Sequence, residues 1–289
     1  MTTSLKVLVT GATGKQGGAV ARLLLDHGHS VRAVTRNLSS PAATALAQLG
    51  AELITGNLAD RDSMNRAVRG MDAVYSMATP FEAGTDAETK QGMTTADAAK
   101  GAGAHLLYSS VGDANRGTGI PHFDSKYAVE RHIDSIGVDA TVIGPAYFME
   151  NMAYLQAQMR NSIYPSPLTP DRKLAQISLP DIAAVSVTVL ENRERYTGKR
   201  FDISADEVSA NDTIRILADI TGRKFHHYQL PLDVVRSTMG EDSALMFEYF
   251  ERTGYHVDRD ELARAFPDVR WTSFESWARA FDWASFLSD

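Results

Sequence analysis

The chain of 289 residues contains no cysteine. This absence excludes disulfide bonds, thiolate zinc sites and cysteine nucleophiles together. The sequence also has no block of Lys and Arg, and its 36 acidic and 29 basic residues give a formal net charge of −7, so we expect no nucleic-acid partner. No apolar run approaches the roughly 20 residues of a membrane span, and the first residues resemble no signal peptide. We therefore expect a cytoplasmic protein without a membrane partner.

Two kinds of enzyme site are missing from the sequence as well. No Gly-x-Ser-x-Gly elbow is present, which disfavours a serine hydrolase. Among the eight histidines, no pair has a useful ligand spacing to a carboxylate, and the adjacent His226 and His227 would point to opposite faces of a strand. We expect no bound metal.

The first 145 residues alternate between short apolar runs and helical patterns. The strands are predicted at 5–10, 31–35, 51–55, 72–77, 104–109 and 140–143, and the helices at about 15–27, 41–49, 61–69, 86–102 and 122–136. This alternation is typical of βαβ units, and it predicts an α/β fold with a doubly wound parallel (Rossmann) sheet. Ligands of such sheets bind outside the carboxyl ends of the strands.

The alternation stops after Pro145. Residues 162–170 contain three prolines and predict an irregular loop. Further helices are predicted from Ser178 to about 191, at 211–221, 231–254 and 258–265, and from Thr272 to about 287, with strands near 200–204 and 225–230. We expect residues 1–150 to form a nucleotide-binding domain and residues 151–289 a smaller C-terminal α+β lobe that partly returns to the sheet.

Glycine occurs at every third position in the turn between the first predicted strand and helix, at Gly11, Gly14 and Gly17. Gly11 permits the sharp exit from the strand, Gly14 a close approach to phosphates, and Gly17 close packing of the helix on the sheet. The free N–H groups of the first helical turn then face an anion. The turn predicts a binding site for a dinucleotide pyrophosphate. The residues of this site are Gly11, Ala12, Thr13, Gly14, Lys15, Gln16 and Gly17.

The end of the second predicted strand distinguishes the two nicotinamide cofactors. A site for NAD usually has Asp or Glu there, whereas this chain has Arg36, which could pair with a 2′-phosphate. The alternative is a solvated arginine at a strand end. Lys15 could add a second positive charge, so NADP(H) is favoured. Two other strand ends belong to the same predicted site, one with Asn57 and Leu58 and the other with Met77, Ala78 and Thr79.

These motifs, together with His122 to Lys126, Gly144 to Asn151, Leu179 to Ile182 and Tyr196 to Phe201, resemble the NmrA-like family, an atypical branch of the short-chain dehydrogenase/reductase superfamily. The resemblance extends over the whole chain. It implies NADP(H) bound additionally by Lys126, Ala146, Tyr147, Phe148 and Met149.

The resemblance also implies a departure from the superfamily. Its ordinary members use Tyr-x-x-x-Lys, and this chain keeps the spacing as His122 and Lys126 without the phenol. Three interpretations of His122 stay open: a proton donor, a plain residue at the helix start of a cofactor sensor, or a polar rim residue while water or Tyr147 supplies the proton. Ser109 and Ser110 end a predicted strand, where Ser110 could polarise the substrate or simply cap local backbone.

Two classes of function follow. The leading hypothesis is an NADPH-dependent oxidoreductase that reduces a small, largely apolar carbonyl, enone or quinone, using Lys126, His122 and Ser110. The apolar residues at 239–255 could line its pocket or belong to the core. The alternative is a regulatory protein of the NmrA type that binds NADP(H) and senses redox state without turnover. A nucleotide-sugar or isoflavone-type enzyme is a weaker option, and a homodimer is compatible with all of these.

Overall fold

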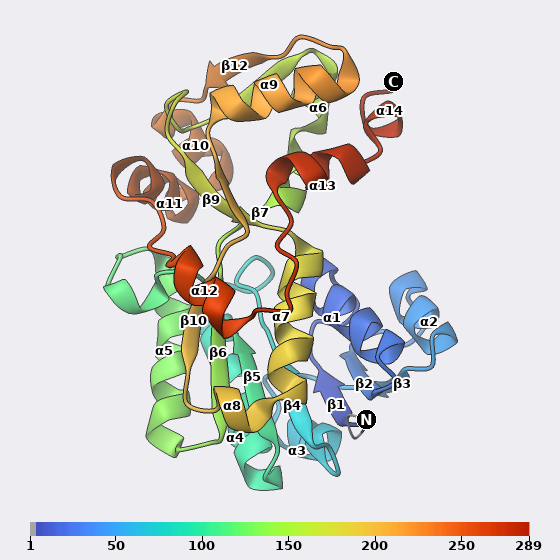
Figure 1. Ribbon diagram of the computed structural model, residues 1–289. Coiled ribbons are helices and arrows are strands. Elements are labelled where there is room, and N and C mark those ends of the chain that lie inside the picture. Colours follow the sequence, from blue (N-terminus) through green and yellow to red (C-terminus); the bar gives the residue numbers. More distant parts are fainter. Residues whose placement is uncertain (1–3, 289) are drawn as a thin grey trace.

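The structure, a computed structural model, describes residues 4–288 (Figure 1). Its centre is a seven-stranded sheet in the order β10-β6-β5-β4-β1-β2-β3, and every neighbouring pair is parallel. The strands are β1 (Lys6–Val9), β2 (Ser30–Thr35), β3 (Glu52–Thr55), β4 (Ala73–Ser76), β5 (His105–Ser109), β6 (Ala140–Pro145) and β10 (Arg200–Ile203). The predicted doubly wound parallel sheet is confirmed.

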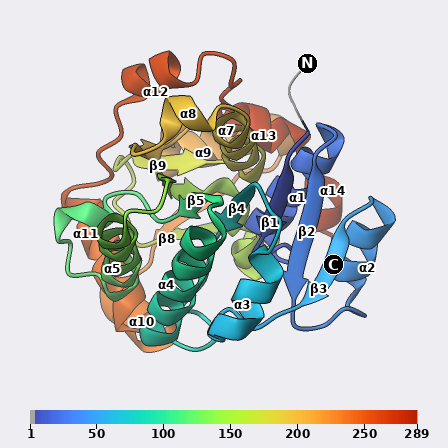
Figure 2. The same cartoon turned by 90° about the horizontal axis from the view of Figure 1, so that it is seen from below.

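Helices cover both faces of this sheet (Figure 2). On one face lie α1 (Lys15–Asp26), α2 (Pro41–Gln48) and α7 (Leu179–Glu191), which the short α8 (Arg193–Tyr196) follows; on the other lie α3 (Arg61–Val68), α4 (Thr85–Ala102) and α5 (Pro121–Ile136). Side chains alternate along β1, so that Val7 and Val9 enter one apolar core and Leu8 the other. A parallel strand buried on both faces is a nearly continuous apolar run, as residues Val7 to Val9 of β1 are, while Lys6 at the start of the strand is exposed.

Most of the remaining elements form a smaller α+β part beyond the carboxyl ends of the parallel strands, whereas α12 packs beside β10 (Figure 1). It contains a three-stranded sheet, β11-β9-β7, and a two-stranded sheet, β12-β8. The strands are β7 (Tyr147–Phe148), β8 (Ile163–Ser166), β9 (Leu174–Ile177), β11 (Asp206–Val208) and β12 (His226–Gln229). The helices are η2 (Met149–Leu155), α6 (Gln156–Arg160), α9 (Ala210–Thr221), α10 (Leu232–Met239), α11 (Glu241–Arg252), α12 (Arg259–Ala265), α13 (Phe274–Ala280) and α14 (Trp283–Phe286), while η1 (Ala114–Arg116) lies after β5.

Three sequence-based expectations about this part are wrong. The single helix expected at 231–254 is two helices, because Gly240 has a φ of +91° and interrupts the helix between α10 and α11. The last helix is likewise divided into α13 and α14, and its N-cap is Ser273 rather than Thr272. The loop expected at 162–170 contains β8, which pairs in parallel with β12. A strand whose partner lies some 60 residues away leaves little local signal. No helix among residues 4–288 is long and apolar enough to span a membrane.

A polar cluster joins the C-terminal end of α1 to that of α7. His27 Nδ1 and His29 Nε2 each lie 3.0 Å from the same oxygen, Glu191 Oε1. The backbone N–H of Leu5 donates to His29 Nδ1 at 3.2 Å, so neutral His29 carries its proton on Nε2 and donates it to Glu191. Burial raises the pKa of Glu191, but the hydrogen bonds and charges of the two histidines lower it by a larger amount. The net result is a pKa below the usual value of 4.5.

Glu191→Gln therefore reduces stability in a pH-dependent way. Because the folded-state pKa is lowered, the stabilisation is present above about pH 4.5 and is lost as the pH falls through the folded pKa. We expect a loss of about 1 kcal/mol at pH 7 in urea unfolding, and a smaller difference from wild type below pH 4. Glu194→Gln, an exposed neighbour on α8, serves as the control. An equal difference at both pH values would contradict this explanation.

Candidate functional site

Two positions in and just after the turn that follows β1 require glycine, one because of its backbone conformation and the other because of a close backbone contact. Gly11 has a φ of +62°, and a Cβ at Gly17 would lie 2.5 Å from the Gly11 carbonyl oxygen and 2.7 Å from that of Thr10. Both neighbours are backbone atoms, which cannot rotate away. The N-cap of α1 is Gly14, whose lack of a side chain leaves the helix start uncapped, and no acidic residue occupies its first turn. The first amides of α1 are thus free to bind an anion, and a dinucleotide pyrophosphate fits this turn.

Hydrogen bonds join the loop after β4 and the end of β5 to this turn. Thr10 Oγ1 donates to the Met77 carbonyl and accepts from the Met77 N–H, both at 2.8 Å. Buried Gln16 donates from Nε2 to Ser109 Oγ at 2.6 Å. The ends of three strands, β1, β4 and β5, therefore meet at one edge, and Met77, Ala78 and Thr79 lie beside the glycine turn.

The residues after β2 and β3 lie further along the same edge. Arg36 follows β2, and its guanidinium makes two contacts with Glu82, Nη1–Oε2 at 2.8 Å and Nη2–Oε1 at 3.1 Å. Asn57 follows β3, where its side-chain oxygen accepts the N–H of Ala59 at 3.0 Å, and Leu58 is partly buried against a core. Asn57 thus stabilises its own loop in this structure.

Helix α5 carries three polar side chains at intervals of four residues, His122, Lys126 and Glu130, which therefore share one side of the helix. Each is bonded to a different element. Lys126 Nζ lies 2.8 Å from Glu88 Oε1 on α4 and donates to the Ala78 carbonyl at 3.1 Å. Glu88 is completely buried, and its other oxygen accepts from Ser125 Oγ at 2.5 Å. Lys126 is thereby fixed beside the loop after β4.

His122 is bonded to the first turn of α11. Its Nδ1 lies 2.8 Å from both carboxylate oxygens of Asp242, and its backbone N–H donates to Asp242 Oδ1 at 3.3 Å. Burial raises the pKa of Asp242, but the hydrogen bonds and charge of His122 bring it below its usual value. Within residues 4–288, no hydrogen bond engages His122 Nε2, and the side chain is 12% exposed. One ring nitrogen is therefore held and the other is available.

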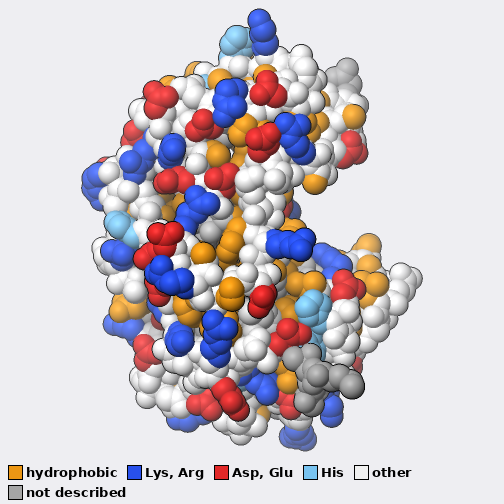
Figure 3. Space-filling model, in the orientation of Figure 1, with side chains coloured by type: hydrophobic (Ala, Val, Ile, Leu, Met, Phe, Trp, Pro, Cys, Tyr) orange, Lys and Arg blue, Asp and Glu red, His pale blue; other side chains and the backbone are white. Residues whose placement is uncertain are grey.

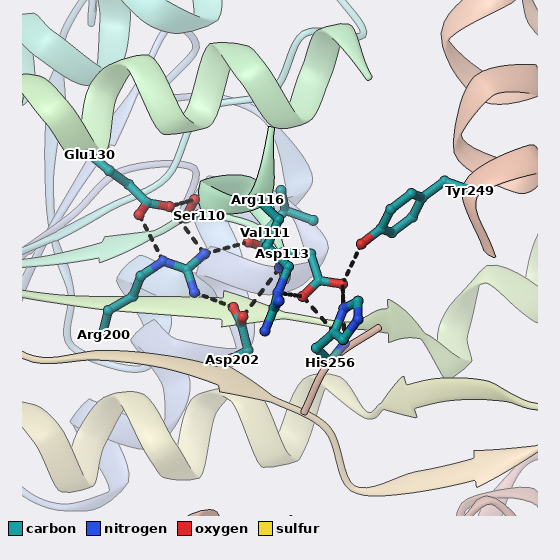
Figure 4. Close-up of polar contacts among 9 residues, drawn as sticks. All are labelled: Ser110, Val111, Asp113, Arg116, Glu130, Arg200, Asp202, Tyr249 and His256. Carbon is teal, nitrogen blue, oxygen red and sulfur yellow. Dashed lines mark hydrogen bonds and ion pairs between the residues drawn. The ribbon is translucent and has the colours of Figure 1, made fainter. Parts of the chain in front are cut away.

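Ser110 belongs to a buried polar network (Figure 4). Its hydroxyl donates to Glu130 Oε1, and Arg200 on β10 donates from Nε to Glu130 Oε2 at 2.8 Å. Arg200 also contacts Asp202 Oδ1 at 2.5 Å and the carbonyl of Val111 at 3.1 Å. In this arrangement the hydroxyl proton of Ser110 is engaged by Glu130 of α5.

The network continues to α11 through Asp113, which is fully buried and has a φ of +60°. Asp113 accepts from the hydroxyl of Tyr249 at 3.0 Å and from the backbone N–H of His256 at 3.1 Å, and its N–H donates to Asp202 Oδ2 at 3.2 Å (Figure 4). Burial raises the pKa of Asp202 to about 6, against the opposing effect of the Arg200 charge. The loop after β5 is thereby joined to α11.

The residues after β6 are mostly apolar and pack against the smaller part. Ala146 and Met149 are buried, and Tyr147 lies 6.4 Å from Phe247 and 6.5 Å from Phe250, measured between ring centroids. Burial raises the pKa of the Tyr147 phenol, which makes it a weaker proton donor. Within 239–255, Phe247, Tyr249 and Phe250 are buried in a core cluster, whereas Met239 is 55% exposed. Most of this cluster is core.

A deep hollow opens on one side of the molecule between the parallel sheet and the smaller part (Figure 3). Lys15, the first residue of α1, places its Nζ 4.6 Å from the ring centroid of Tyr154 in η2. Tyr154 is 73% exposed. This contact connects the glycine turn directly to the smaller part.

The structure also brings together residues that no sequence motif connects. Asp242 lies 120 positions from His122, and Glu88 lies 38 positions from Lys126, as their numbers show. Within residues 4–288, one group has the composition of a metal site, His27, His29 and Glu191, with ligand atoms within 4.8 Å of one another. The hydrogen bond from Leu5 to His29 Nδ1 leaves the Nε2 of neutral His29 protonated, which opposes metal coordination there.

The fold and the glycine turn define a Rossmann-type dinucleotide-binding class of protein. The model of the NmrA-like family matches residues 3–278, and the chain belongs to this family. It is 27% identical over 285 residues to the NmrA-like family domain-containing oxidoreductase FrzB of Cladobotryum sp., covering 86% of this chain and 84% of that protein.

Two solved structures have the same fold. The triphenylmethane reductase of Citrobacter sp., solved as a complex with NADP(H), superposes with a TM-score of 0.81 at 20% identity and covers 95% of this chain and 99% of its own. NmrA, described as a negative transcriptional regulator and solved in complex with NADP, superposes with a TM-score of 0.76 at 21% identity, covering 96% of this chain and 95% of its own. The fold thus occurs both in a reductase and in a regulator.

Lys126→Met is expected to destabilise the protein by about 3 kcal/mol, because it leaves the buried Glu88 carboxylate without its counter-charge. The double variant Lys126→Met/Glu88→Gln removes both charges, and we expect it to recover most of that loss. Urea unfolding of the wild type, both single variants and the double variant gives the coupling energy. Additive effects would show that the two side chains are energetically independent.

Proposed function

We propose that this protein is an NADPH-dependent reductase of a small, largely apolar carbonyl, enone or quinone. The observation that carries the proposal is His122, which lies one helical turn from Lys126 and whose Nδ1 is held by Asp242, while its Nε2 has no hydrogen-bond partner in the part of the chain that the structure describes. A histidine oriented in this way can donate a proton to a substrate oxygen. The oxidoreductase relative and the fold of an NADP(H)-bound reductase support the same class of reaction.

The residues around the glycine turn fit an NADP(H) molecule. The amides of residues 11–17 would hold the pyrophosphate, Arg36 the 2′-phosphate, Asn57 and Leu58 the adenine side, and Met77 to Thr79 the adjoining ribose and pyrophosphate. Lys126 and residues 146–149 would hold the nicotinamide end. When bound, the reduced nicotinamide supplies hydride.

The chain's own task is then to deliver a proton and stabilise developing negative charge on the substrate oxygen. Asp242 accepts from His122 Nδ1 and so keeps a proton on that nitrogen, and in the doubly protonated ring Nε2 is the atom that donates to the substrate. The other two candidates are less suited. Ser110 donates to Glu130, and burial raises the pKa of Tyr147.

Lys126 has a positioning role in this proposal. Glu88 offsets its charge, so Lys126 contributes less to lowering the pKa of a neighbouring acid than a lysine without a counter-charge. The ion pair and the bond to Ala78 fix Nζ where a ribose hydroxyl can accept from it. The counter-charge on Lys126 thus occurs in a chain where the His122 imidazole stands in place of the usual tyrosine phenol.

His122→Ala is expected to lower kcat at least about 100-fold, the lower end of the contribution of a general acid, while the affinity for NADPH stays within about twofold. NADPH absorbance is followed with a panel of quinones and enones. The matched control is His132→Ala, which removes a second histidine of α5, paired with Asp97 at 2.8 Å. Tight binding of NADPH by the wild type without turnover across the panel would contradict the reductase proposal.

Arg36→Ala tests the cofactor separately. Loss of a charge-assisted contact to the 2′-phosphate is expected to weaken NADPH binding about 10- to 100-fold and to leave NADH binding unchanged. Fluorescence titration with both dinucleotides measures the two affinities, with Arg66→Ala on α3 as an exposed control. Equal affinity of the wild type for NADH and NADPH would contradict the assignment of NADP(H).

A regulatory protein that binds NADP(H) without turnover is the second candidate. The absent phenol favours it, and so does the shared fold of NmrA, a negative transcriptional regulator. Binding of NADPH without oxidation by any member of the panel is the result expected of such a protein.

A further inference from the structure

The guanidinium that would select the cofactor already has a carboxylate partner. Glu82 belongs to the segment between β4 and α4, and its two oxygens contact the two terminal nitrogens of Arg36 at 2.8 and 3.1 Å. This is the paired, fork-shaped contact that a guanidinium also makes with a phosphate group. We propose that Glu82 is a specificity-determining residue, which competes with the 2′-phosphate of the dinucleotide for Arg36. The proposal rests on the proposed NADP(H) site.

The pair is exposed enough to exchange partners. The Arg36 side chain is 77% exposed and that of Glu82 is 59% exposed, so water screens their attraction and separating them costs little. The segment that carries Glu82 is exposed over residues 81–84, including Phe81 at 85%. A 2′-phosphate, with a charge of up to −2, is a stronger partner for Arg36 than one carboxylate.

Glu82 therefore affects the two dinucleotides differently. A dinucleotide without the phosphate can bind while the Arg36–Glu82 pair stays intact. A dinucleotide with the phosphate must first displace Glu82, and it then has a carboxylate close to its own negative charge. Glu82 thus lowers the preference for the phosphorylated cofactor below the value that Arg36 alone would give.

Glu82→Gln is expected to tighten NADPH binding roughly three- to tenfold and to leave NADH binding within twofold of wild type. The titrations use the full chain with each dinucleotide at low ionic strength. The matched control is Asp86→Asn, which removes one exposed negative charge four residues further along, in the first turn of α4. A gain of the same size in this control would overturn the proposal, because general surface charge would then explain it.

The background variant Arg36→Ala separates competition from simple repulsion. In that background we expect Glu82→Gln to tighten NADPH binding by less than half of its fold-effect in wild type, since no guanidinium is left to release. Suppose that the wild type prefers NADPH and that this preference depends on Arg36. If Glu82→Gln then binds NADPH no more tightly than the wild type, the role of Glu82 is overturned and the cofactor assignment stands. A wild type without any preference for NADPH overturns the cofactor assignment as well, so the two failures are distinguishable.

Discussion

The close approach of α1 to the turn after β1 is the constraint on which the site depends. At Gly17 there is no space for a Cβ between the helix and the carbonyls of Gly11 and Thr10. Because α1 starts this close, Gln16 reaches Ser109, and the same turn lets Thr10 hold Met77. One backbone contact thus fixes the relative positions of three strand ends, which form the edge where a dinucleotide would lie.

Helix α5 is the second organising element. Its residues His122, Lys126 and Glu130 bond to α11, α4 and β10 respectively, so a single helix face connects the parallel sheet to the smaller part. Buried charges of this kind are tolerated only when they are paired and hydrogen-bonded. The pairing directs Ser110 and Lys126 into structural contacts, while the Nε2 of His122 makes no hydrogen bond to any of residues 4–288.

The central sheet was predictable because its signals are local. An apolar strand such as β1, a glycine turn and an amphipathic helix each follow from a few neighbouring residues. The β8–β12 pair was not predictable in this way, since it joins residues 163–166 to residues 226–229, whereas the break between α10 and α11 has a local cause, a glycine at position 240 with a φ of +91°. In the site, Arg36 and Lys126 were identifiable from their places in motifs, but their partners Glu82 and Glu88 were not.

The parallel sheet, the glycine turn and the family can be recognised in the amino-acid sequence, because backbone conformation and hydrophobic periodicity are encoded in adjacent residues. The partner of each charged side chain, by contrast, depends on the folded chain. Asp242 holds one nitrogen of His122, Glu130 accepts the hydrogen bond of the Ser110 hydroxyl, and Glu88 neutralises Lys126. Electrostatic partners are selected by distance and burial in the folded chain, and neither quantity can be read from separation along the sequence.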